Sequence, residues 1–395
     1  MCTISEQLAD FVASATFDAL PESVVNQTKN CILDTLGAAL LGSETQASRI
    51  LMSTVLKMSE ESAASTVIGS SLKCPTPHAG YVNTMNAAFL ELDNGHRRSG
   101  VHPGCITVPA AMSLAESLHL SGKEMLTAVA LGHEIMVRIG MSTMSAHYHR
   151  GLDPTGSIGV LGAATSAGKV LELRKEEMKN AFGIAGTQAP LSPSEWWYAG
   201  SMAKSLAFAE ATYAGIVSAL LAKNGMTGPS TILEGKGGFC AATCWPEKYD
   251  LSLIVHDLGR KWEMEKVYYK FHSSCRWTHA AVDAVLKIRR QQGLDPRYLQ
   301  QLTVRTYPMA ARLTEARPKD ETAARLSIPF CVAAAIIDGQ VGPDQFSSNR
   351  LGDPELLDVA SKVMVVADPE FRESWPEKRS TTVDVRFTDG RELSY

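Results

Sequence analysis

Apolar positions recur with helical spacing over about the first two-thirds of the chain. Capping-box patterns at Thr3/Glu6 and at Ser121/Glu124 each stand just ahead of such a run, where a helix begins. Residues 201–223 form a long Ala-rich run that is followed by a glycine. The pattern predicts an all-helical domain in this part of the chain.

The pattern changes in the last third of the chain. Strand-like runs alternate with helical ones: the strands are expected at 302–307, 362–368 and 382–388, and the helices at 278–292, 321–338 and 354–361. Asp389-Gly390 follows the last strand and is a strong hairpin signal. We therefore expect a mainly α fold class, with an all-helical domain over residues 1–265 and a smaller α+β domain over residues 266–395.

The composition narrows the class of protein. Lys and Arg total 38 and Asp and Glu total 42, a net charge of −4, which lacks the basic excess of nucleic-acid and anionic-membrane binders. The eight cysteines are scattered and form no CxxC pair, which is typical of a reducing compartment. The first residues are acidic and lack the basic region of a secretory signal. We expect a cytoplasmic protein with neither nucleic acid nor membrane as a partner.

The densest polar segment is the loop at 91–104, which contains Asp93, His96 and His102. Loops so rich in titratable groups concentrate binding and catalysis, although a solvated surface loop has the same composition. The spacing of the three side chains matches no metal-ligand pattern, so we expect no metal. Pro103 favours an extended backbone at His102, which would hold the imidazole in one direction, as a general base requires. Asp93 is near enough to orient that ring.

Two further candidate groups lie in the helical part. The turn Asp153-Pro154-Thr155-Gly156 leads into a helix, and the free N–H groups of a helix start can hold a carboxylate. The same residues are equally explained if Asp153 or Thr155 caps the helix. Lys204, near the start of the run at 201–223, is either an anchor for an anion or an ordinary solvated lysine.

A last cluster lies at the expected domain junction, where ligand sites are common. It contains Lys270, Cys275, Arg276 and His279, of which His279 opens a helix and is equally explained as a capping or core histidine. No glycine-rich nucleotide-binding loop stands in the right context, so we expect no NAD, ATP or flavin and no other cofactor.

Taken together, these segments resemble the MmgE/PrpD family. The resemblance is carried by CILDTLGAALLG at 31–42, the acidic loop ending in HPG, PTGSIGVLGAATSAGKVLEL at 154–173, SMAKSLAFAEATYAG at 201–215 and RLSIPFCVAAAIIDG at 325–339. It implies a large helical bundle with a smaller α+β lid, an active site between the two, and a homodimer. Family chains are usually longer, so we expect the family's C-terminal return segment to be missing here.

The residues and the resemblance together give a candidate site. The expected catalytic residues are His102, Asp93, Lys204 and Lys270, and the expected substrate-binding residues are His96, Asp153, Thr155, Arg276 and His279. Two positions depart from the family pattern. Asp153 stands where many members have His, and Phe330 stands where the decarboxylases have Tyr.

The chemistry that the resemblance implies is proton transfer at a carbon next to a carboxylate, without a redox cofactor. We expect a cofactor-independent lyase that dehydrates a 2-methylcitrate-like hydroxypolycarboxylate, with a small-molecule polycarboxylate as its substrate. One alternative is an isomerase, epimerase or decarboxylase that acts on a related polycarboxylate. A second alternative is a non-catalytic helical scaffold, which citrate-like polyacids would not stabilise in a thermal-shift measurement.

Overall fold

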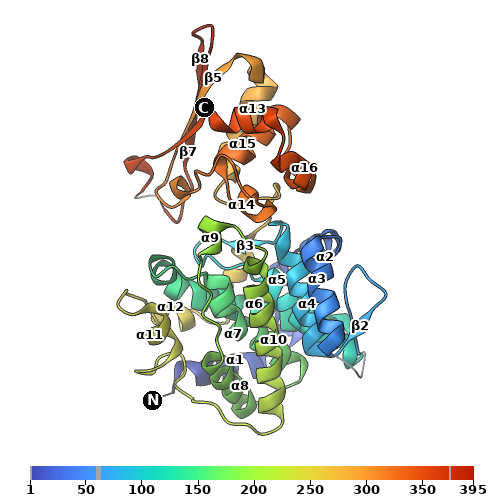
Figure 1. Cartoon of the computed structure of the whole chain (residues 1–395). Helices are drawn as coiled ribbons and strands as arrows, with labels where there is room; N and C mark the ends of the chain where they lie inside the picture. Colours follow the sequence, from blue (N-terminus) through green and yellow to red (C-terminus); the bar gives the residue numbers. More distant parts are fainter. Residues whose placement is uncertain (1, 59–63, 373–374) are drawn as a thin grey trace. The chain divides into compact units, whose positions relative to one another are not determined.

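The chain divides into two compact units (Figure 1). A computed structural model describes residues 2–58, 64–372 and 375–395. Unit 1 contains Met1–Phe89, Asp93–Ser194 and Ala203–Tyr269, and unit 2 contains Leu90–Leu92, Glu195–Met202 and Lys270–Tyr395. Two short segments of unit 2 therefore interrupt unit 1 in the sequence.

Unit 1 is helical. Its helices are α1 (Ile4–Ser14), α2 (Glu22–Ser43), α3 (Gln46–Met58), α4 (Thr76–Phe89), α5 (Gly104–Ser117), α6 (Gly122–His149), α7 (Pro154–Val170), α8 (Lys175–Thr187), α10 (Ala203–Lys223), α11 (Phe239–Cys244) and α12 (Ser252–Val255), with 3-10 turns at Phe17–Ala19 and Glu263–Lys266. Two short antiparallel pairs accompany them: β1 (Ser65–Thr66) with β2 (Lys73–Cys74), and β3 (Gly95–His96) with β4 (Val267–Tyr268). Both predicted capping boxes are present, at Thr3/Glu6 and Ser121/Glu124.

The core of unit 1 is organised around α7, which packs against both α6 and α10. Small residues allow the close approach: a Cβ built on Gly215 of α10 would lie 2.4 Å from the Cβ of Ala163 in α7. Nearly every residue of α7 is buried. By length and hydropathy α10 could cross a membrane, but most of its apolar window is buried inside unit 1, as in the core helix of a globular domain.

Unit 2 combines a four-stranded sheet with short helices. The strands are β5 (Leu299–Thr306), β6 (Val363–Ala367), β7 (Thr381–Phe387) and β8 (Glu392–Ser394), in the order β6-β5-β7-β8. The helices are α9 (Trp196–Ala199), α13 (His279–Gln292), α14 (Glu321–Arg325), α15 (Ile328–Asp338), α16 (Ser348–Leu351) and α17 (Pro354–Ser361), with 3-10 turns at Pro296–Tyr298, Ala310–Arg312, Pro343–Phe346 and Pro369–Phe371.

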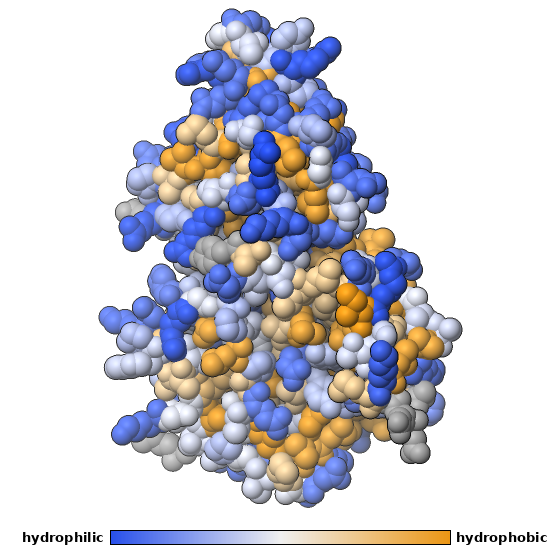
Figure 2. Space-filling view, in the orientation of Figure 1, coloured by the Kyte–Doolittle hydropathy of each residue, from blue (hydrophilic) through white to orange (hydrophobic). Residues whose placement is uncertain are grey.

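The sheet is mixed, because β5 pairs in parallel with β6 and antiparallel with β7. Leu302 and Val304 of β5 lie opposite Val385 and Val383 of β7, and all four side chains are buried. α13 contacts β7, α15 contacts β6, and the two helices contact each other. On the visible face, Figure 2 shows hydrophobic residues interspersed with hydrophilic ones over both units.

The fold class is confirmed: a large helical part is accompanied by a smaller α+β part. The hairpin predicted at Asp389-Gly390 joins β7 to β8, with Gly390 at a φ of 86°. The single helix predicted over 321–338 is wrong, because it is two helices that break at Leu326 and Ser327. Ser327 caps the start of α15, where its hydroxyl accepts a hydrogen bond from the N–H of Phe330. Pro329 stands in the first turn of α15, where its missing N–H is not needed.

Candidate active site

The loop after α4 is held in a tight turn inside unit 1. β3 pairs with β4, and the N–H of His96 donates to the carbonyl of Val101 at 2.9 Å. The N–H of Gly100, which has a φ of 67°, donates back to the carbonyl of His96 at 3.0 Å. This turn reverses the chain and brings His102 back beside Asp93 and Asn94.

His102 is paired with a buried carboxylate. Its Nδ1 lies 3.0 Å from Oδ2 of Asp93 and 3.0 Å from the carbonyl oxygen of Asn94. Both partners are acceptors, so we assign the proton to Nδ1, which leaves the lone pair on Nε2. The Asp93 side chain is 1% exposed and the His102 side chain is 17% exposed. A neutral imidazole held in this tautomer is the form that accepts a proton in general base catalysis.

Neighbouring elements fix the position of the pair. The Asn94 side chain donates to Asp34 of α2 at 3.0 Å and accepts from the N–H of Gly104 at the start of α5 at 3.0 Å. The backbone N–H of His102 donates to Oγ1 of Thr155 at 3.2 Å. Asn94 was not among the sequence candidates, since a lone asparagine in a loop gives no signal of its own.

Thr155 and Asp153 form the start of α7. Oδ1 of Asp153 accepts from the N–H groups of Thr155 at 2.7 Å and Gly156 at 3.2 Å. Asp153 therefore caps α7, as one of the two interpretations of this turn predicts. The carboxylate that accepts from these N–H groups is that of Asp153 itself. Burial raises the pKa of Asp153 to about 6, although His102 and these N–H groups act in the opposite direction.

Lys204 lies in the first turn of α10 and is buried. Its Nζ is 5.5 Å from the centre of the Phe208 ring, and the same ring lies nearly parallel to the His102 imidazole, at 6.4 Å between centres and 22° between planes. Phe208 therefore lies against both a cation and a candidate base. A lysine at the positive end of a helix works against the helix dipole, so this position does not stabilise α10.

A second polar cluster lies within unit 2. Nζ of Lys270 is 2.7 Å from Oε2 of Glu91, and the side chains are 0% and 5% exposed. Glu91 has a φ of 55°, which a non-glycine residue seldom adopts. No local pattern predicts this pair, because the two residues are 179 positions apart.

The two histidines of this cluster differ in their partners. Nε2 of His279 lies 3.2 Å from the carbonyl of Ser274, and Nε2 of His272 lies 2.9 Å from Oδ1 of Asp283. Burial lowers the pKa of His279 to about 2, and the charges of Arg276, His272 and Lys270 add to this effect. His279 is therefore a neutral ring at physiological pH, and Arg276, which is half-buried, is a cation beside it.

His96 is buried within its own turn, and its Nδ1 lies 3.0 Å from Oγ of Ser99.

Across residues 2–58, 64–372 and 375–395, no group of three or more His, Cys, Asp or Glu side chains is placed to hold a metal ion.

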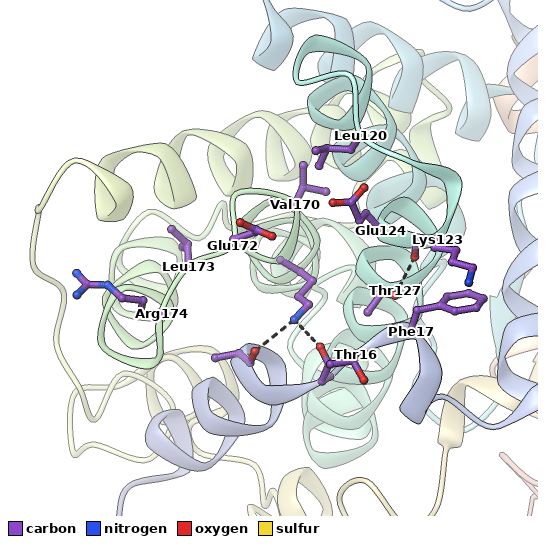
Figure 3. A pocket seen from close by; sticks show the side chains of 13 residues that line it. Thr16, Phe17, Leu120, Lys123, Glu124, Thr127, Val170, Glu172, Leu173 and Arg174 are labelled. Carbon is purple, nitrogen blue, oxygen red and sulfur yellow. Dashed lines mark hydrogen bonds between the residues drawn. The ribbon is translucent and has the colours of Figure 1, made fainter.

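A pocket of about 420 Å³ in unit 1 shares no residue with the cluster around His102 (Figure 3). Lys169 from α7 reaches into it and donates to the carbonyls of Val12 at 3.1 Å, Ala13 at 3.3 Å and Ala15 at 2.6 Å. These carbonyls belong to the last turn of α1 and the residue that follows, where intrahelical donors are missing. Lys169 therefore serves to anchor α1.

The fold and the clusters define a mainly helical protein with a smaller α+β unit and a carboxylate-paired histidine. Residues 6–252 match the MmgE/PrpD N-terminal domain, and residues 272–394 match the MmgE/PrpD C-terminal domain. The chain belongs to the MmgE/PrpD family.

Several characterised proteins are similar over most of their length. The chain is 25% identical over 416 residues to a cis-aconitate decarboxylase of Aspergillus terreus, covering 99% of this chain and 84% of that protein. It is 26% identical over 385 residues to the cis-aconitate decarboxylase of Homo sapiens, covering 93% and 77% respectively. It is also 23% identical over 415 residues to a mitochondrial 2-methylcitrate dehydratase of Yarrowia lipolytica, covering 99% and 78%.

Proposed function

We propose that this chain is a cofactor-independent lyase that dehydrates a 2-methylcitrate-like hydroxypolycarboxylate. The observation that carries the proposal is the Asp93–His102 pair, with its proton-accepting Nε2 and a buried lysine beside the same aromatic ring. Such a set supplies a base and a cation, the two groups that removal of a proton next to a carboxylate requires.

The proposed reaction begins with Nε2 of His102, which takes the proton from the carbon α to a carboxylate. The electron pair of that C–H bond moves toward the carboxylate, where Lys204 stabilises the developing negative charge. Asp93 stabilises the imidazolium that forms. The electrons then form the carbon–carbon double bond as the hydroxyl on the neighbouring carbon leaves. His102 returns its proton to that hydroxyl, so the products are an unsaturated polycarboxylate and water.

A second candidate is decarboxylation, because several of the similar proteins are cis-aconitate decarboxylases. In that reaction a carbon–carboxylate bond breaks, CO2 leaves, and His102 as imidazolium donates a proton to the carbon. The case for decarboxylation is weakened by the two departures from the family pattern, Asp153 in place of His and Phe330 in place of the Tyr of the decarboxylases.

The test is incubation of the full chain with citrate, 2-methylcitrate, cis-aconitate and iminodisuccinate in D2O, followed by NMR. Dehydration gives an olefinic product from a hydroxy acid, decarboxylation gives a product one carbon shorter, and epimerisation gives deuterium at the α-carbon alone. A His102→Gln variant run in parallel shows whether the signal depends on the proposed base. A scaffold would give no product and no deuterium incorporation.

Three further calls belong to the proposal. On the family resemblance we propose that Lys270 and Arg276 bind carboxylates of the substrate and that the protein is a homodimer. On the scattered cysteines and the acidic first residues we propose that it resides in the cytoplasm. Light scattering on the purified chain measures the dimer directly, and the kinetics of a Lys270 variant are predicted in the Discussion.

A further inference from the structure

Tyr268 lies directly opposite Gly95 where β3 pairs with β4. A Cβ built at position 95 would lie 2.6 Å from the Tyr268 hydroxyl oxygen and 2.8 Å from its Cζ, too close for any real side chain. The same Cβ would lie 3.3 Å from Nδ1 of His102. The Tyr268 hydroxyl therefore fills the space that a side chain at position 95 would take, and that space borders Nδ1 of His102, the nitrogen that pairs with Asp93.

The next residue has different contacts. The hydroxyl of Tyr269, which follows β4, donates to Oε1 of Gln27 at 3.1 Å and lies 3.7 Å from Sγ of Cys31, both on α2. The Tyr268 hydroxyl, in contrast, is the one that lies over Gly95. The Tyr268 side chain is half-buried, so it is not sealed in the core.

We propose that Tyr268 is a further substrate-binding residue of the His102 site, whose hydroxyl donates a hydrogen bond to the carboxylate next to the carbon that His102 deprotonates. This inference rests on the proposed function. A phenol is a neutral donor at physiological pH, so it supplies a hydrogen bond without adding charge beside the Asp93–His102 pair. Negative charge builds on that carboxylate as the proton leaves, so the hydrogen bond is stronger in the transition state than in the bound substrate.

The first test is Tyr268→Phe, which removes the hydroxyl and keeps the ring over Gly95. We expect kcat to fall by about 10- to 100-fold, as for one hydrogen bond to a charged group, with a small change in KM and in melting temperature. The exchange of the α-proton into D2O should fall by the same factor. Tyr269→Phe is the matched control, because it removes a neighbouring hydroxyl that faces α2, and its turnover should stay at the wild-type level.

The second test restores a hydroxyl from the opposite strand. Tyr268→Ala should lose activity as Tyr268→Phe does, and it also clears the space above Gly95. Adding Gly95→Ser to Tyr268→Ala returns a hydroxyl to that space, and kcat should recover by about fivefold or more. A structural role of the tyrosine ring would not be restored by serine, so this pair decides the question even if Tyr268→Phe is unstable.

The outcomes separate the two proposals. Wild-type protein that forms no olefinic product and exchanges no α-proton of any polycarboxylate rejects the proposed function, and the role of Tyr268 with it. Active wild-type protein whose Tyr268→Phe variant has a kcat within about twofold of it rejects the role of Tyr268 alone, since the loss of a real hydrogen bond is larger than this. A Cβ at position 95 lies 3.3 Å from Nδ1 of His102, so the melting temperature of Tyr268→Ala/Gly95→Ser is measured as well. A double variant that keeps the melting temperature of Tyr268→Ala and gains no activity overturns the role of the hydroxyl.

Discussion

Nδ1 of His102 and Oδ2 of Asp93 are 3.0 Å apart and share a hydrogen bond, yet the two side chains differ in solvent exposure. The Asp93 side chain is 1% exposed and the His102 side chain is 17% exposed. The carboxylate is shielded from water and also lies 3.7 Å from Sγ of Cys105 at the start of α5. The imidazole is the more exposed of the two side chains, and its orientation is set from inside the protein by Asp93 and the carbonyl of Asn94.

His102→Gln should keep the fold and lose most of kcat. Glutamine preserves a hydrogen-bond donor toward Asp93 but cannot accept the proton, so the loss should be on the order of 10²- to 10⁴-fold. His256→Gln is the control, since His256 is 74% exposed and lies elsewhere in unit 1. Melting temperature and α-proton exchange are measured on one sample of each protein. A destabilised His102 variant with near-normal exchange would show that His102 only packs the loop.

Lys204→Met should raise KM and lower kcat/KM, because a carboxylate of the substrate loses its cationic partner. The loss of one charge-assisted hydrogen bond corresponds to roughly 1.5–3 kcal/mol in kcat/KM. Methionine keeps the length of the side chain and its contact with Phe208. Lys248→Met, at an exposed position, is the control for the change of net charge. Steady-state kinetics with the best substrate of the panel measure both, and unchanged values for Lys204→Met would remove this residue from the site.

Lys270→Met should destabilise unit 2 as well as alter kinetics. The substitution leaves the Glu91 carboxylate buried without its 2.7 Å partner, a change that costs about 3–5 kcal/mol in comparable buried pairs. The double variant with Glu91→Gln removes the stranded charge and should regain part of the stability. If kcat/KM stays low in the double variant while stability returns, Lys270 acts on the substrate; if both return together, its role is structural.

Stability should fall as the pH falls from about 6.5 to 4, the range between the unfolded and folded pKa of two buried histidines. Burial lowers the pKa of His133 and His147 in α6 to about 4. In this range the unfolded chain binds protons that the folded chain does not, so each histidine lowers the free energy of unfolding by up to about 1.4 kcal/mol per pH unit. Urea unfolding at several pH values measures the slope, which His147→Phe should flatten and the exposed-site control His256→Phe should not.

Asp153 should act in the opposite direction. Its pKa of about 6 in the folded chain lies above its unfolded value near ~3.8, so the folded chain binds the extra proton between these values. The contribution of Asp153 to stability therefore rises as the pH falls through about 6. Asp153→Asn keeps the acceptor that caps α7 and removes the titration, so the acid loss of stability should become steeper. An unchanged slope would mean that Asp153 stays ionised in the folded chain.

Removal of metal ions should leave activity intact. In the parts of the chain that the structure describes, the Asp and His side chains of the site loop belong to no group of three potential ligands. Dialysis against a strong chelator followed by the NMR assay checks this. A loss that one divalent ion restores would revive the metal interpretation of Asp93, His96 and His102.

Local signals in the sequence predicted most of the elements but few of their partners. Pro354–Ser361 was predicted to the residue, because Pro suits a helix start and the apolar spacing is regular. Asp93 and His102 are close in sequence, and a tight turn suffices to join them. Glu91 and Lys270 are far apart in the sequence, as are Phe208 and His102, and the fold brings each pair together. No local pattern encodes such contacts, because they depend on how the loops and helices of the folded chain are placed.

The pairing of β3 with β4 determines where a fragment that contains unit 1 should end. The N-terminal family domain matches residues 6–252, whereas unit 1 extends to Tyr269. A fragment that stops at residue 252 would lack β4, so the strand that precedes His102 would have an unpaired edge, and Tyr268 would be absent from its place over Gly95. Such a fragment would also lose Ile254, Trp262 and Met264 from the core of unit 1, together with the backbone partners of the buried Arg138 side chain. A useful dissection of the two units therefore ends the first one after Tyr269.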